Sequence, residues 1–129
     1  MMKLILVLAS ILGLSSVMLG ALESHVFGAM LTLKNAQRFG IALHCQQLYS
    51  ILLVALSLYG LQRNPPKLLH LVCVIFLLGV FIFSGSLYAL IFLAKPIFRY
   101  GTPCGGALLM LGWILLLLFS MFYKPQNGR

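Results

Sequence analysis

The sequence predicts an all-α integral membrane protein: a bundle of four transmembrane helices joined by short loops. Hydrophobic residues make up 62% of the 129 residues and charged residues only 8%, against about 25% charged residues in soluble domains. Four charge-free stretches each reach the roughly 20 mostly apolar residues that a spanning helix needs. Lysine and arginine gather between these stretches, where they would meet lipid headgroups. No room is left for a soluble domain, so we expect residues 1–129 to form a single membrane domain.

The first span is predicted over about residues 4–22. The apolar run after Lys3 resembles a signal peptide, but it is longer than a typical signal core and no small-residue cleavage site follows, so we expect it to be retained. The only long connection is residues 23–38. Apolar residues recur in it at helical spacing, which predicts an interfacial helix or an extension of the first span.

The other three spans are predicted over about residues 39–62, 68–94 and 103–123, and prolines mark their ends. Asn64-Pro65-Pro66 predicts a tight turn between the second and third spans. Lys95-Pro96 ends the third span, because the residue before a proline avoids the helical conformation. Thr102-Pro103 is typical of an N-cap followed by the first residue of a helix.

The cations favour one orientation. One side of the membrane, side A, holds both termini and the 63–67 turn; side B holds the other two connections. Cytoplasmic segments carry the excess of lysine and arginine, so we expect both termini in the cytoplasm, with the chain in the inner (plasma) membrane of a bacterium. The cations are Lys3, Arg63, Lys67, Lys124 and Arg129 on side A, against Lys34, Arg38, Lys95 and Arg99 on side B, where Glu23 offsets one.

Several functional classes lack the residues they need. Glu23 is the only acidic residue, which excludes carboxylate-dyad hydrolases, acidic metal cages and Ser-His-Asp triads built in this chain alone. The basic residues form no continuous stripe, so we expect no nucleic-acid partner. We also expect no catalytic residue, metal or cofactor, because neither the cysteines nor the histidines have ligand spacing; they are Cys45, Cys73, Cys104, His25, His44 and His70.

Uncharged polar side chains gather in the side B half of the spans. At a rise of about 1.5 Å per residue they fall in one slab about 10–15 Å from side B. An unsatisfied polar group in hydrocarbon is costly, so we expect them to point inward. They either satisfy one another in a dry core or line a blind polar pocket with Glu23 and His25 at its mouth. The candidate pocket residues are Gln46, Tyr49, Ser50, Ser84, Tyr88 and Trp113, whose indole N–H needs an acceptor.

Small residues predict where helices approach closely. The series Ser16, Gly20, Ser24 and Gly28 runs out of the first span, while Gly105 and Gly112 lie one heptad apart on the fourth. We expect packing within the bundle, with oligomer contacts as the alternative. Because a short turn joins the third and fourth spans, we also expect Ser84 or Ser86, together with Tyr88, to pack against residues 105–113.

Three motifs resemble a known family. Phe83-Ser84-Gly85-Ser86-Leu87-Tyr88, Thr102-Pro103-Cys104-Gly105-Gly106 and Gly112-Trp113 resemble the FSGSLY, TPxGG and GW motifs of the small four-span proteins called domain of unknown function 423, to which the animal transmembrane protein 256 is similar. Residues 19–25 resemble the family's LGAFGAH segment, with Glu23 in place of a glycine, and Tyr49 stands at the histidine of its Q-x-x-H segment. The resemblance implies a four-helix membrane fold and no particular activity.

These observations favour a non-catalytic membrane component that acts through helix packing with a second copy of itself or with another membrane protein, in contact with membrane lipids. One alternative is binding or passage of a small polar solute, water or a lipid headgroup through the blind polar pocket. A second is a membrane enzyme acting on lipid, for which His25, His44 and Glu23 are the only groups available as a base.

Overall fold

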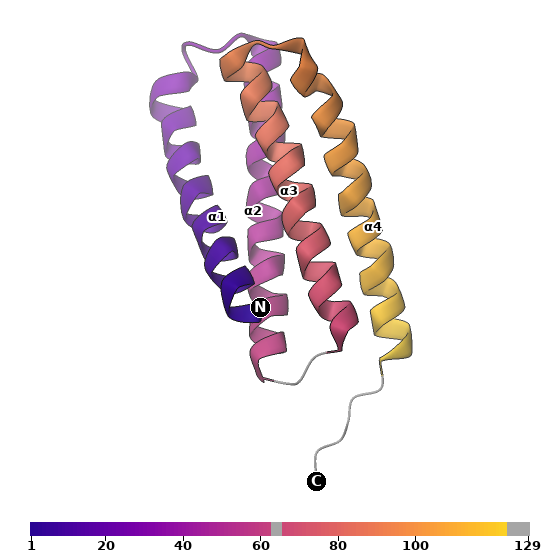
Figure 1. Ribbon diagram of the computed structural model, residues 1–129. Helices are drawn as coiled ribbons and strands as arrows, with labels where there is room; N and C mark the ends of the chain where they lie inside the picture. Colours follow the sequence, from indigo (N-terminus) through magenta and orange to yellow (C-terminus); the bar gives the residue numbers. More distant parts are fainter. Residues whose placement is uncertain (63–65, 124–129) are drawn as a thin grey trace.

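The computed structural model describes residues 1–62 and 66–123. The four main helices of this part are α1 (Met2–Leu22), α2 (Leu33–Gln62), α3 (Lys67–Leu93) and α4 (Gly101–Phe122), each long and apolar enough to cross a membrane. Successive helices run antiparallel, so the start of α1 and the end of α4 lie at the same end of the molecule (Figure 1). The predicted all-α, four-helix membrane fold is confirmed. The predicted turn at Asn64-Pro65 and the cations Arg63, Lys124 and Arg129 lie outside the described residues.

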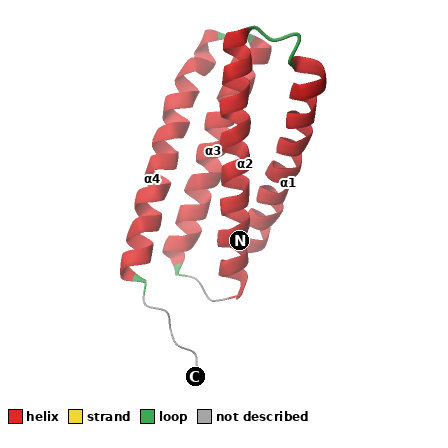
Figure 2. Cartoon of the chain, turned by 180° about the vertical axis from the view of Figure 1, so that it is seen from behind, coloured by secondary structure: helices red, strands yellow, loops and turns green. Residues whose placement is uncertain are grey.

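The helices form a row rather than a closed ring. The main contacts join α1 to α2, α2 to α3 and α3 to α4, and α1 touches α3 only slightly. Figure 2 shows the same order from behind. The core lies between α1, α2 and α3, where Ala9, Leu53 and Phe76 are completely buried. Large apolar side chains such as Val17 and Met110 are more than half exposed, as expected for surfaces that face acyl chains.

The connections on side B differ from the prediction in two places. The predicted extension of the first span is confirmed for Glu23–Phe27, a π-helical turn that continues α1, but residues from Leu33 onwards already belong to α2. The fourth helix begins at Gly101, after a 3₁₀ turn over Pro96–Tyr100, so Thr102 lies inside its first turn and the N-cap prediction is wrong. The third helix ends as predicted before Lys95-Pro96, with Ala94 in the left-handed conformation (φ 52°).

Glycines of α4 let it lie directly against α3. A Cβ atom at Gly105 would overlap the backbone nitrogen of Phe83 and would lie 2.7 Å from its Cα. A Cβ atom at Gly112 would lie 2.6 Å from the ring of Phe76. Both positions therefore pack closely, and only glycine fits the observed distance between the two helices.

The small-residue series of α1 packs within the chain over only half its length. Ser16 is 2% exposed, and a Cβ atom at Gly20 would make an ordinary 3.6 Å contact with Leu43. Ser24 and Gly28 are exposed, which corrects the expectation that the whole series packs inside the bundle. The π-helical turn explains the change: the Gly28 N–H donates to the Glu23 carbonyl five residues earlier (2.8 Å), and the wider turn breaks the α-helical register.

Candidate functional site

Gln46 of α2 forms hydrogen bonds with both α1 and α3. Its Nε2 donates to the Leu12 carbonyl (3.0 Å) and to Ser15 Oγ (2.8 Å), both on α1. Its Oε1 accepts the hydroxyl hydrogen of Tyr88 on α3 (2.9 Å). Gln46 is only 4% exposed, so the amide points into the protein with both of its N–H groups and its carbonyl engaged. Each bond replaces one that water would supply outside the membrane.

The two serines of the polar slab bond backbone groups. Ser84 on α3 donates to the carbonyl of Ala42 on α2 (2.9 Å). Ser50 donates to the carbonyl of Gln47 on its own helix (2.8 Å) and therefore links no helices. Both are 4% exposed. Ser84 thus adds a second polar link between α2 and α3, next to the one from Tyr88 to Gln46.

A separate pair links α2 to α4. The indole N–H of Trp113 donates to the hydroxyl of Tyr49 at 2.7 Å, which confirms that this indole has an acceptor. The Tyr49 and Trp113 rings also pack on Phe76 of α3, with centroid distances of 5.3 Å and 5.5 Å. Tyr49 is 6% exposed, whereas Trp113 is 46% exposed at the surface of the bundle. Trp113 therefore does not line a polar interior.

The expected contacts between α3 and α4 are partly wrong. Tyr88 and Ser84 face α2, as their hydrogen bonds show. Ser86 instead faces α4: its hydroxyl lies 2.9 Å from that of Thr102, and its Cβ occupies the space that a side chain at Gly101 would need. Ser84 and Ser86 are about 200° apart around the helix, so they cannot face the same neighbour.

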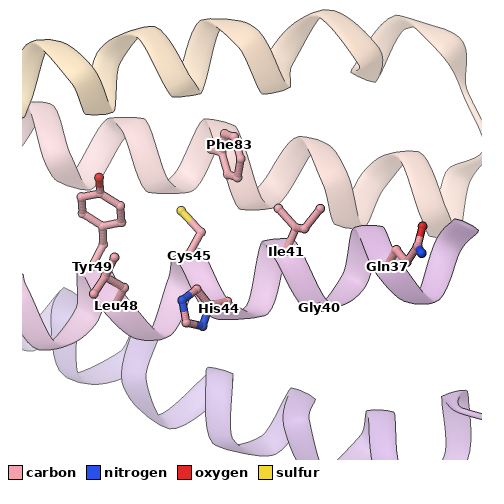
Figure 3. Close-up of a pocket in the computed structure, with 8 residues that line it drawn as sticks. All are labelled: Gln37, Gly40, Ile41, His44, Cys45, Leu48, Tyr49 and Phe83. Atoms are coloured by element: carbon pink, nitrogen blue, oxygen red, sulfur yellow. The ribbon is translucent and has the colours of Figure 1, made fainter.

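Four of the six candidate pocket residues line one of two hollows, and the other two, Ser50 and Trp113, line neither. The first, the α1–α3 hollow, has a volume of about 220 Å³ and its polar lining residues are Ser15, Gln46, Ser84 and Tyr88. The second, the α2 groove, has a volume of about 650 Å³ and includes Tyr49 among its lining residues. Figure 3 shows the α2 groove, which is lined by Gln37, Gly40, Ile41, His44, Cys45, Leu48, Tyr49 and Phe83.

Glu23 and His25 do not form the mouth of either hollow. Neither lines the α1–α3 hollow or the α2 groove, and His25 is exposed. The helix continues through both residues, which places them about one to two turns beyond Leu19, the last α1 residue that lines the α1–α3 hollow. Among the described residues, Glu23 has no ion-pair partner within 4.0 Å.

The sequence analysis did not assign Ser15, His44 or Cys45 to a pocket. Ser15 bonds Gln46, while His44 and Cys45 line the α2 groove. The signal for the groove was the stripe Gln37, Ile41, His44 and Leu48, which repeats at helical spacing of three or four residues. Within residues 1–62 and 66–123, no three histidine, cysteine or acidic side chains converge as metal ligands.

Comparison with known proteins places these features among membrane proteins. A family model described as a protein of unknown function (DUF423) matches residues 19–106. The UPF0382 membrane protein of Haemophilus influenzae is 36% identical over 111 residues, which cover 86% of this chain and 88% of the relative. The UPF0382 inner membrane protein YgdD of Escherichia coli K12 is 28% identical over 125 residues, covering 97% and 95% of the two chains. The UPF0382 membrane protein SH2409 of Staphylococcus haemolyticus is 28% identical over 117 residues, covering 91% and 94%. No solved structure matches the chain.

Proposed function

The chain belongs to the DUF423 family of membrane proteins, and we propose that it is a non-catalytic component of the bacterial inner membrane. In this proposal it associates through helix packing with a second copy of itself or with another membrane protein. Relatives named as inner membrane proteins support that location. The small excess of lysine and arginine on side A supports a cytoplasmic position for both termini.

The proposal rests on the hydrogen bonds between the helices, because the polar side chains that form them have their partners inside the protein. Gln46, Tyr88, Tyr49 and Trp113 bond one another or neighbouring side-chain and backbone groups. Membrane pathways for ions or protons usually carry ionisable groups inside the bundle. Here the hydrogen-bonded groups that link the helices are amides, hydroxyls and an indole, which hold helices together.

The exposed π-helical turn after α1 offers a surface for association. Ser24 and Gly28 are small, exposed and outside the intrachain core, and small residues let a second helix approach closely. The proposal is tested with Ser24→Leu, which places a large side chain on this surface. Ser10→Leu is the matched control, because Ser10 is also exposed on the same helix and also bonds its own backbone.

Cross-linking in intact membranes, followed by native mass spectrometry of the purified complex, measures the association. We expect Ser24→Leu to lower the amount of assembled protein and Ser10→Leu to leave it unchanged. Assemblies of equal size and yield in both variants would contradict the proposal.

A second candidate function is binding of a small neutral polar ligand in the α1–α3 hollow. Its support is the set of four polar side chains that line the hollow. Gly85 also lines it, and a Cβ atom there would meet nothing within 4 Å. Gly85→Leu should therefore fill the hollow without disturbing the fold. Loss of a co-purified small molecule in this variant, detected by mass spectrometry, would support this function; an unchanged set of bound molecules would refute it.

A further inference from the structure

The α2 groove has the length of one membrane leaflet. It extends along α2 from Gln37 to Tyr49, a rise of about 18 Å at 1.5 Å per residue. Half of a hydrocarbon core about 30 Å thick is about 15 Å. Since α2 begins on side B, the groove runs from the side B surface to near the middle of the membrane, which is the depth that one acyl chain occupies.

The lining of the groove suits an acyl chain. Ile41 and Leu48 are about half exposed along it, and Phe83 of α3 lines its other wall (Figure 3). Gly40 provides the width, because a Cβ atom there would meet nothing within 4 Å. The Tyr49 hydroxyl at the deep end already accepts the Trp113 indole hydrogen, so the deep end presents a satisfied polar group to its occupant.

The α2 groove ends in a polar side chain near side B, and a cation lies beyond that end. Gln37, the lining residue nearest the start of α2, places a polar amide at the side B end of the groove. Lys34 precedes Ile41 by seven residues, which places it on the same face of α2, about 10 Å nearer that surface. The described side B cations are Lys34, Arg38, Lys95 and Arg99 against the single acid Glu23, a net charge of 4 − 1 = +3.

We propose that the α2 groove is a binding site for an anionic phospholipid of the side B leaflet. One acyl chain lies along Ile41, Leu48 and Phe83, and Lys34 attracts the headgroup phosphate. The length of the groove, the apolar side chains of Ile41, Leu48 and Phe83, and the cation Lys34 together specify an anionic lipid rather than lipid in general. A helix from a second copy is the competing occupant, and the experiment distinguishes the two.

Trp113 supplies a built-in probe for the site. It is the only tryptophan of the chain, and its indole is hydrogen-bonded to Tyr49, which lines the deep end of the groove. The full chain is reconstituted into phosphatidylcholine vesicles that contain increasing fractions of phosphatidylglycerol. Bromine atoms, which quench tryptophan fluorescence on contact, are placed on the acyl chains of one lipid or of the other. We expect brominated phosphatidylglycerol to quench Trp113 at a lower mole fraction than brominated phosphatidylcholine.

Two pairs of variants test whether the preference for phosphatidylglycerol depends on Lys34 and on the α2 groove. Lys34→Gln should lower the preference for phosphatidylglycerol by about fivefold, the contribution of one cation near a membrane surface, and Lys67→Gln at the side A end of α3 is its control. Gly40→Leu should fill the groove and abolish the preference. Gly85→Leu is its control, because it also enters open space but lines the α1–α3 hollow.

Three results would overturn the proposal. The first is equal quenching by the two brominated lipids in the unaltered protein. The second is an equal effect of Lys34→Gln and Lys67→Gln, which tests the charge even if Gly40→Leu fails to insert. The third is a change of oligomeric mass in Gly40→Leu with an unchanged lipid preference, which would assign the groove to a second copy. Loss of assembly in Ser24→Leu concerns a different surface and leaves this result unaffected.

Discussion

Replacing Gly105 by alanine should separate α3 from α4. The new Cβ atom would overlap the Phe83 backbone nitrogen and would lie 2.7 Å from Phe83 Cα, against at least 3.4 Å for ordinary contact, a deficit of 3.4 − 2.7 = 0.7 Å. The obstacle is backbone, so no side-chain rotation relieves it. Overpacking of this kind costs about 1–3 kcal/mol of folding free energy.

The control is the adjacent glycine. A Cβ atom at Gly106 would lie 3.9 Å from the Phe83 ring, which is ordinary contact. Both substitutions gain the same helix propensity, about 1 kcal/mol for alanine over glycine. The difference between Gly105→Ala and Gly106→Ala therefore isolates the clash, and we expect Gly105→Ala to be about 1–3 kcal/mol less stable than its control.

The assay is reversible unfolding by sodium dodecyl sulfate in mixed micelles, followed by circular dichroism and by Trp113 fluorescence. The reasoning also predicts that Phe83→Ala does not rescue Gly105→Ala, because the clashing atoms include the nitrogen, Cα and Cβ atoms that alanine retains. Equal stability of Gly105→Ala and Gly106→Ala would refute the close backbone contact, and rescue by Phe83→Ala would show that the outer side chain causes the strain.

Three further predictions concern the polar groups. Gln46→Ala removes three hydrogen bonds, each worth about 0.6 kcal/mol in a membrane, and should lower the unfolding free energy by about 2 kcal/mol; Gln47→Ala is the control, and equal losses would contradict the interhelical role. Trp113→Phe and Tyr49→Phe should each lower stability, and their double-mutant cycle should show a coupling of about 0.6 kcal/mol; additive losses would mean that the bond contributes nothing. Among the described side chains, Ser57 Oγ is buried with no hydrogen-bond partner, so Ser57→Ala should raise the unfolding free energy by about 1 kcal/mol, and a lower midpoint in the same titration would disprove this.

The polar side chains that link the helices are satisfied within the protein, so we expect contacts with lipids or other proteins on its exposed surfaces. Gln46 and Tyr49 are nearly buried and bonded inside the protein. Two exposed surfaces are our proposed contacts within the plane of the membrane: the π-helical turn after α1 around Ser24 and the α2 groove around Gly40. Each has its own variant and its own measurement, so the two roles are tested independently.

Much of the fold follows from the sequence alone. Backbone groups in hydrocarbon must be satisfied within their own segment, so long apolar runs become helices. The end of α3 follows from Lys95-Pro96, and the inward orientation of Gln46 follows from the cost of exposing an amide to acyl chains. The heptad spacing of Gly105 and Gly112 likewise indicates one close-packing face on α4.

The partners of each side chain depended on tertiary packing. Helical periodicity determines the angle between Ser84 and Ser86 but not which of them faces α2. That choice depends on the rotation of α3 about its axis, which is set by long-range contacts such as Phe83 against Gly105. The rotations of α2 and α3 together place Gln46, Ser84 and Tyr88 at the α1–α3 hollow and Tyr49 at the α2 groove. One-dimensional spacing describes each helix separately, whereas these features arise from the relative rotation and separation of two or three helices.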